Sequence, residues 1–141
     1  MRRIRNQRGA ALIETAITLP IVLLVSVAIF EFGRAYQTWQ VITNAAREGA
    51  RVSILVDQSD AQVTGAVRNY LTGGRLPAAG TAGITIERSV AFGGNTASRV
   101  TVNYPFNFMV LSPVVRLVQR TSTLGQGTLT MSSVAMMRNE S

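Results

Sequence analysis

A long apolar segment close to the N-terminus constrains what this chain can fold into. Residues 10–32 carry mostly large aliphatic and aromatic side chains, and their number is close to the roughly 20 residues that cross a bilayer core as a helix. These side chains together favour insertion by about 4 to 7 kcal/mol. Glu14 opposes it by about 3 kcal/mol or less, because it lies only one turn inside the segment. The segment therefore predicts a membrane-spanning helix.

A basic leader precedes this segment. Four of the fourteen basic residues lie in the first eight positions. By the positive-inside rule they hold the N-terminus in the cytoplasm, so that everything after Gly33 lies outside it. Without residues 1–9 the chain would keep ten arginines against seven acidic residues, a net charge of +3. The basic charge thus belongs mainly to the leader, and we expect no nucleic-acid partner. The leader arginines are Arg2, Arg3, Arg5 and Arg8.

The carboxylate of Glu14 is the unusual feature of the apolar segment, because an ionisable group in a membrane span needs a partner or a function. Gly9 lies five residues before it, at the junction between leader and apolar run. This combination resembles the processing site of type IV-like prepilins, which are cut after the glycine. Cleavage there would free the amine of Ala10. Glu14 of one subunit could then neutralise that amine on a neighbouring subunit, which offsets the cost of burying either charge alone.

Helical spacing continues beyond the membrane segment. Apolar or small residues recur at helical intervals as far as Ser53, which predicts one helix from about 10 to 55, roughly 70 Å long at 1.5 Å per residue. Small side chains at Ala46, Gly49, Ala50 and Ser53 predict a stripe on which a sheet can pack closely. A second set of residues is expected to mark the membrane surface: Glu31, Gly33, Arg34, Tyr36 and Trp39.

The second half of the chain changes to the alternating pattern of strands. Residues 84–90 and 98–104 predict an antiparallel hairpin around a turn at 93–95, and residues 128–137 predict a third strand. The fold class is therefore α+β, with a long N-terminal helix packed against a small antiparallel sheet of about three strands, a type IV pilin-like architecture. The connecting elements expected are a helix over 61–71 capped by Ser59 and ended by Gly73 and Gly74, a flexible connection over 73–83, and a crossing loop from 105 with a short helix over 113–118.

Four parts follow from these elements. They are a basic leader (1–9), a transmembrane helix (10–32), an extension of that helix (33–56) and an extracytoplasmic α+β domain (57–141).

The amino-acid composition argues against an enzyme. The chain has no histidine and no cysteine, which removes the commonest general base, the commonest zinc ligand and any thiol nucleophile. Its glycine-rich segments lack the lysine and hydroxyl residue that complete a phosphate-binding loop. We expect no catalytic residues, no metal site and no cofactor. The carboxylates outside the long helix are scattered without a pattern: Asp57, Asp60, Glu87 and Glu140.

Three stretches resemble the TadE-like family, minor pseudopilins of tight-adherence (Flp) pilus systems. They are RGAALIETAITLP at 8–20, NAAREGAR at 44–51 and SSVAMMRNE at 132–140. The resemblance implies that a prepilin peptidase cuts between Gly9 and Ala10, and that Glu14 serves recognition and assembly. It also implies partners among other pilin or pseudopilin subunits and the inner-membrane pilus platform, a role in surface attachment, and no catalysis. The protein would then sit in the bacterial inner membrane, in contact with the lipid bilayer, with its C-terminal domain periplasmic or extracellular.

Two alternatives stay open on the sequence alone. The residue after the carboxylate is Thr15, where the processing motif usually has an aromatic side chain, so the chain could remain uncut as a permanently anchored single-pass protein with an extracytoplasmic binding domain. A conventional signal peptidase could instead cut after the small residues at 26–28, although the apolar run is longer than the 7–15 residues typical of secretory signals.

Overall fold

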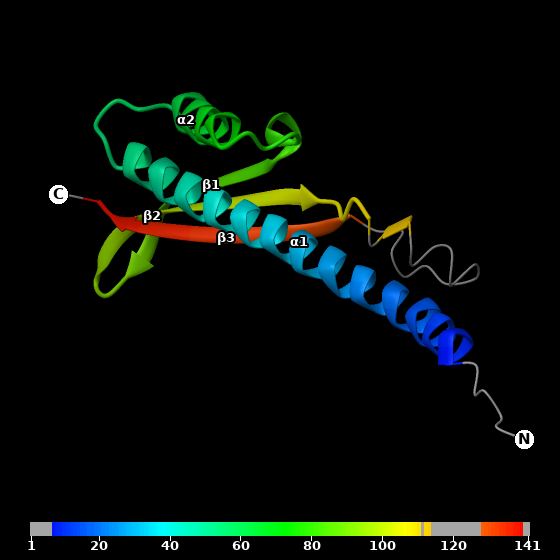
Figure 1. Cartoon of the computed structure of the whole chain (residues 1–141). Helices are drawn as coiled ribbons and strands as arrows, with labels where there is room; N and C mark the ends of the chain where they lie inside the picture. Colours follow the sequence, from blue (N-terminus) through cyan, green and yellow to red (C-terminus); the bar gives the residue numbers. More distant parts are fainter. Residues whose placement is uncertain (1–6, 111, 114–127, 140–141) are drawn as a thin grey trace, which may run out of the picture.

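One continuous helix forms the axis of the molecule (Figure 1). The computed structural model describes residues 7–110, 112–113 and 128–139. Within them, helix α1 (Gln7–Ser53) is 47 residues long and passes through Pro20 without a break. Its N-terminal half stands apart from the rest of the chain, and its C-terminal half lies along a sheet. The single long helix predicted from about 10 to 55 is therefore confirmed.

Among the described residues, three antiparallel strands form a sheet in the order β1-β2-β3. They are β1 (Gly83–Phe92), β2 (Asn95–Phe106) and β3 (Leu129–Arg138). Alternate residues of the central strand face the helices and are buried, among them Val100, Val102 and Tyr104. The α+β class and the three-stranded sheet are thus as predicted, with strands somewhat longer than the alternating stretches that identified them.

Helices α1 and α2 (Asp60–Gly73) lie side by side over one face of the sheet (Figure 1). The small stripe of α1 makes this close packing possible. A Cβ atom on Gly49 would stand 2.5 Å from Cγ2 of Val67 on α2 and 3.1 Å from Cγ1 of Val100 on β2. The other stripe residues are also buried: Ala46, Ala50 and Ser53.

Helix α2 begins and ends as its sequence predicts. Ser59 caps its N-terminus in a reciprocal capping box with Gln62. At the other end, Gly74 has an ordinary φ of −74°, so its lack of a side chain serves a different purpose from the usual left-handed cap. A Cβ atom there would collide with Cγ1 of Val41 on α1. The glycine lets the end of α2 approach α1 closely.

Two expectations for loops need correction. The connection over 73–83 contains a short 3₁₀ helix, Ala79–Thr81, and its residues Leu76, Ala79 and Ala82 are buried in the core. It is a packed segment, because its apolar side chains fill the space beside α2. The crossing loop begins later than expected, since Pro105 and Phe106 belong to β2.

The buried face of α1 continues from the small stripe toward the membrane segment. Thr38, Ile42 and Ala45 are buried, whereas Tyr36 and Trp39 are 62% and 46% exposed. Because α1 carries apolar residues on several faces, spacing alone did not separate the buried face from the exposed one.

A β-bulge in β1 directs the side chain of Arg88 toward the turn between the two helices. The strand register shifts between Glu87 and Val90, and Ser89 has a positive φ of 65°. The bulge aims Arg88 at that turn, where its guanidinium pairs with Asp60 at 2.8 Å and donates to the carbonyl oxygens of Ser53 and Gln58 at 3.0 and 2.8 Å. One side chain thus caps the C-terminal end of α1 and fixes the start of α2.

Three predicted features lie outside the described residues. They are leader residues 1–6 with Arg2, Arg3 and Arg5, the part of the predicted short helix at 114–118, and Glu140.

Candidate functional site

The N-terminal half of α1 is an apolar surface without protein cover. Large side chains such as Leu12 and Ile29 are 72% and 69% exposed. Among the described residues this is the one helix long and apolar enough to cross a membrane. Water would solvate so large an apolar surface poorly, so it calls for a membrane or a partner. The helix is therefore consistent with membrane anchoring, as its composition predicted.

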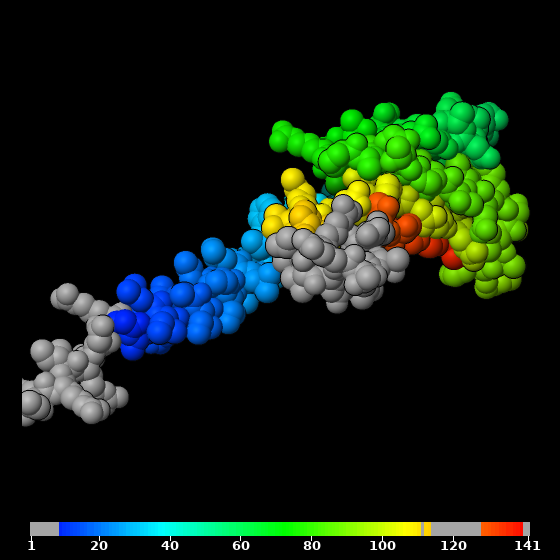
Figure 2. All heavy atoms as spheres, turned by 90° about the vertical axis from the view of Figure 1, so that its right-hand side faces the viewer, coloured from blue at the N-terminus to red at the C-terminus, as the bar shows by residue number. Residues whose placement is uncertain are grey.

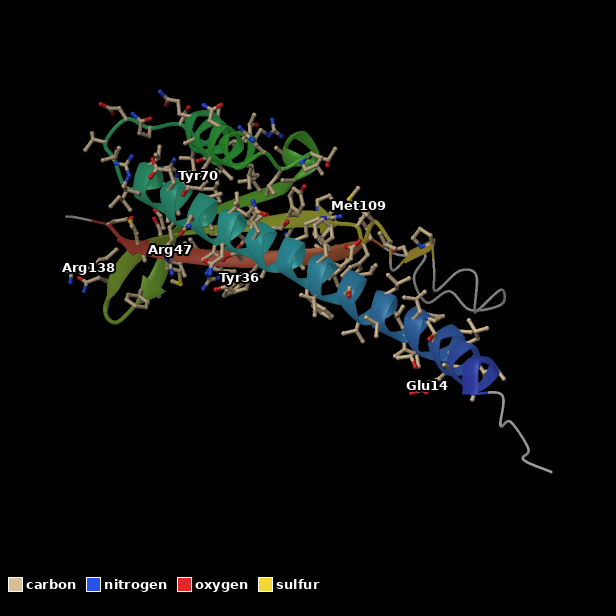
Figure 3. All side chains as sticks on the ribbon, viewed as in Figure 1. Glu14, Tyr36, Arg47, Tyr70, Met109 and Arg138 are labelled. Atoms are coloured by element: carbon tan, nitrogen blue, oxygen red, sulfur yellow. The ribbon has the colours of Figure 1, made fainter. Side chains whose placement is uncertain are left out.

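Glu14 is the exposed carboxylate of this surface, and it points away from the globular part of the chain (Figure 3). It lines a shallow groove of about 350 Å³ on the helix. The hydroxyls of Thr15 and Thr18 beside it donate to carbonyl oxygens of their own helix, at 2.8 and 2.7 Å. Those hydroxyls are satisfied within the helix, while the carboxylate makes no hydrogen bond or ion pair among the described residues. Glu14 is the polar group in this segment that calls for an external partner.

The predicted cleavage residues lie in the same helix. Gly9 and Ala10 are both part of α1, which begins at Gln7. Residues four apart share a face of a helix, so Ala10 and Glu14 lie one turn apart on the same side. The three predicted site residues thus lie within two turns of one helix. Their roles in cleavage and assembly stay predictions.

A second carboxylate, Glu31, is buried, which sequence reasoning missed. It was expected as a marker of the membrane surface, yet its side chain is fully inaccessible to solvent. One carboxylate oxygen, Oε1, accepts hydrogen bonds from the backbone N–H groups of Met109 and Val110, both at 2.8 Å. Glu31 thus binds the loop that follows β2. Figure 3 shows Met109 beside α1, close to the middle of the helix.

Arg34, one turn further along α1, completes this attachment. Its Nη2 donates to the carbonyl oxygen of Asn107 at 2.7 Å, and its guanidinium lies 5.0 Å from the centre of the Phe106 ring. Its Nη1 lies 3.6 Å from Oε2 of Glu31, a charge contact without a hydrogen bond. Two charged side chains of α1 therefore hold residues 106–110.

The sequence marks the two side chains of this attachment but not the backbone groups that they bind. Glu31 stands within an apolar run, where an ionisable side chain needs a partner, and Arg34 follows at helical spacing. The other partners are backbone groups 78 and 79 residues away. No local pattern marks them.

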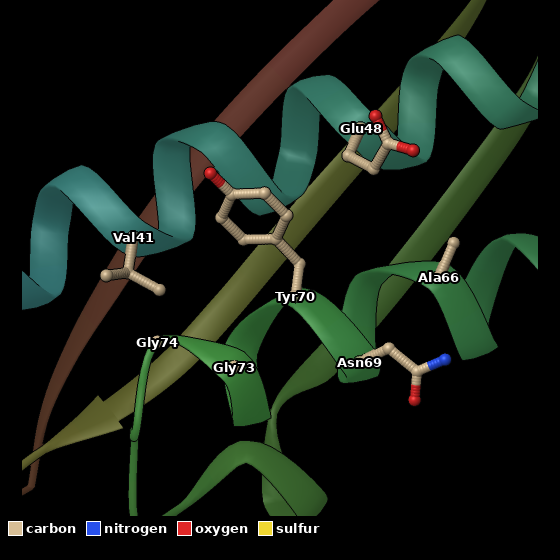
Figure 4. Close-up of a pocket in the computed structure, with 7 residues that line it drawn as sticks. All are labelled: Val41, Glu48, Ala66, Asn69, Tyr70, Gly73 and Gly74. Atoms are coloured by element: carbon tan, nitrogen blue, oxygen red, sulfur yellow. The ribbon is translucent and has the colours of Figure 1, made fainter.

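A groove of about 730 Å³ lies between α1 and α2 (Figure 4). Tyr70 reaches from α2 toward α1 across it, and Glu48 is its acidic group. Arg51 binds that carboxylate through two hydrogen bonds of 2.6 and 2.9 Å, which lower the pKa of Glu48. No second carboxylate lines the groove, and the described residues contain no cluster that could hold a metal ion.

The comparisons with known proteins concern the long helix. A family model described as TadE-like protein matches residues 9–51. These residues include Gly9, Ala10, Glu14 and Glu31, and the stripe residues Ala46, Gly49 and Ala50. Neither the curated proteins nor the solved structures gave a match to this chain. The matched residues form most of the helix that carries Glu14 and Glu31, and this helix is similar to TadE-like proteins, as its sequence motifs predicted.

Proposed function

We propose that this protein is a minor pseudopilin-like, membrane-anchored component of tight-adherence (Flp) pilus biogenesis, with a role in surface attachment. The observation that carries the proposal is the exposed carboxylate of Glu14, which has no partner among the described residues and lies one turn from Ala10, in a helix that matches a TadE-like family model. The α1 helix anchors the chain in the cytoplasmic membrane, and the sheet domain lies outside the cytoplasm. The role is structural and not catalytic.

Assembly follows from the chemistry of two buried charges. A prepilin peptidase removes residues 1–9, and the new N-terminus at Ala10 carries an ammonium group. In a low-dielectric environment an unpaired carboxylate or ammonium costs several kcal/mol. When two subunits pack with their helices in contact, Glu14 of one can pair with the ammonium of the other, and this pairing favours one register between the subunits.

Processing of the leader is the first expected result. In a strain with its own prepilin peptidase, mass spectrometry of the membrane-fraction protein should give a mature N-terminus at Ala10. The same strain without the peptidase should give a chain that starts at Met1. An intact Met1 terminus in both strains would contradict the proposal and favour a permanently anchored protein with an extracytoplasmic binding domain.

Glu14→Ala should leave membrane insertion intact and impair piliation, because the replaced carboxylate no longer neutralises a neighbouring amine. Fibres sheared from cells, together with the membrane fraction, would be quantified for mutant and wild type. Thr18→Ala is the matched control, since the Thr18 hydroxyl bonds to a carbonyl oxygen of its own helix and not to a partner. Normal fibres from the Glu14→Ala strain would remove the assembly role of this carboxylate.

A further inference from the structure

We propose that the loop after β2, residues 107–110, enters the interfacial region of the bilayer, where Met109 and Val110 contact lipid. This inference rests on the proposed membrane anchoring of α1. It adds a second point of contact, by which the globular domain lies against the membrane surface.

The depth of the loop follows from its attachment to α1. The helix rises about 32 Å from Ala10 to Glu31 at 1.5 Å per residue, close to the roughly 30 Å of a bilayer core. Glu31 therefore lies at the edge of that core when α1 spans it. Because Oε1 of Glu31 is 2.8 Å from the backbone nitrogens of Met109 and Val110, those residues are held at the same level. Figure 2 shows the segment around them at the end of the domain that faces the apolar half of α1.

Several side chains at this level are apolar and exposed, and such side chains are more stable in lipid than in water. Met109 is 67% exposed and Val110 is 40% exposed. On α1, Phe30 and Phe32 flank Glu31 and are exposed to a similar degree. Two parts of the chain that are far apart in sequence therefore present uncovered apolar side chains at one depth. Lipid would cover both at once.

Three polar backbone groups of the loop have hydrogen-bond partners within the protein, so the loop can lie where there is little water. Irregular backbone at membrane depth is tolerated where its polar groups have partners inside the protein. Here Glu31 accepts from the N–H groups of Met109 and Val110, and Arg34 donates to the carbonyl oxygen of Asn107. Both side chains come from α1 itself. The buried carboxylate thus supplies the acceptors that water would otherwise provide.

Single-cysteine labelling tests this contact, because the full chain contains no cysteine. The full-length protein with Met109→Cys would carry an environment-sensitive fluorophore in vesicles of phosphatidylethanolamine and phosphatidylglycerol. Spin labels placed at shallow or deep positions of the acyl chains would quench it according to depth. Phe92→Cys is the matched control, an exposed apolar site on the hairpin at the opposite end of the sheet, and Val22→Cys reports the middle of the span.

The expected result is a blue-shifted emission at Met109→Cys, quenched best by the shallow label, at about 15 Å from the bilayer centre. Val22→Cys should be quenched best by the deep label, and Phe92→Cys by neither. Adding Glu31→Ala to Met109→Cys should abolish the blue shift, because the loop is released from α1, while the same change should leave the Val22→Cys signal unaltered.

Two results would overturn the inference, and they differ from a failure of anchoring. If Val22→Cys is quenched while Met109→Cys responds to an aqueous quencher as Phe92→Cys does, α1 spans the membrane and the loop stays in water. If Met109→Cys is shielded from lipid and aqueous quenchers alike, protein and not lipid covers the loop. Absence of quenching at Val22→Cys would contradict the proposed membrane anchoring itself.

Discussion

Glu31→Ala is expected to lower the free energy of unfolding of the globular domain by about 3 kcal/mol or more. The substitution removes an acceptor that serves two backbone N–H groups, and hydrogen bonds to a charged group contribute about 1.5 to 3 kcal/mol each. It also leaves the half-buried guanidinium of Arg34 without its neighbouring carboxylate. Denaturant unfolding of the protein in detergent micelles, followed by circular dichroism, would measure the change.

Two variants separate this effect from the general loss of a charge. Glu31→Gln keeps an oxygen that can accept both N–H groups, so it should cost clearly less than Glu31→Ala. Glu48→Ala breaks a pair with Arg51 whose side chains are 33% and 55% exposed, and such surface pairs contribute about 1 kcal/mol or less. A cost for Glu31→Ala no larger than that for Glu48→Ala would show that the Glu31 attachment is not a main support of the fold.

The elements that local patterns specify were predictable from the sequence. Apolar composition identified α1, Ser59 identified the start of α2, and alternation identified the three strands. Each of these signals lies within a few residues of the element that it forms. The small stripe was predictable for the same reason, because Gly49 and its neighbours repeat at helical spacing.

The contacts that hold these elements together depend on distant residues. Arg88 reaches the turn between the helices because a bulge with a positive φ at Ser89 redirects the strand, and an alternating pattern does not specify a bulge. Glu31 binds backbone N–H groups, which nearly every residue has, so the sequence does not mark the residues that it binds. At the candidate site, the sequence located Gly9, Ala10 and Glu14, since a motif places them within one helix. Their proposed partner is another subunit, so the packing of a single chain adds only that they lie on one helix.

Gly49→Ala should destabilise the domain by about 1 to 3 kcal/mol, although alanine is the better helix former. In an open helix position the same change would gain up to about 1 kcal/mol. At Gly49 the added Cβ would meet Val67 at 2.5 Å and Val100 at 3.1 Å, so α2 and the sheet must both move away from α1. The cost of overpacking between two β-branched side chains exceeds the gain in helix propensity.

Gly65→Ala is the matched control, because Gly65 also lies within a helix and a Cβ atom there would meet nothing within 4 Å. The two substitutions are chemically identical and should shift the unfolding midpoint in opposite directions. Val67→Ala made in the Gly49→Ala background should cost less than Val67→Ala alone, since the smaller side chain relieves the collision. Equal stabilisation by both glycine substitutions would mean that α1 does not pack as closely as this stripe implies. Opposite signs would instead show that the NAAREGAR stretch is constrained by the contact between the helices and the sheet.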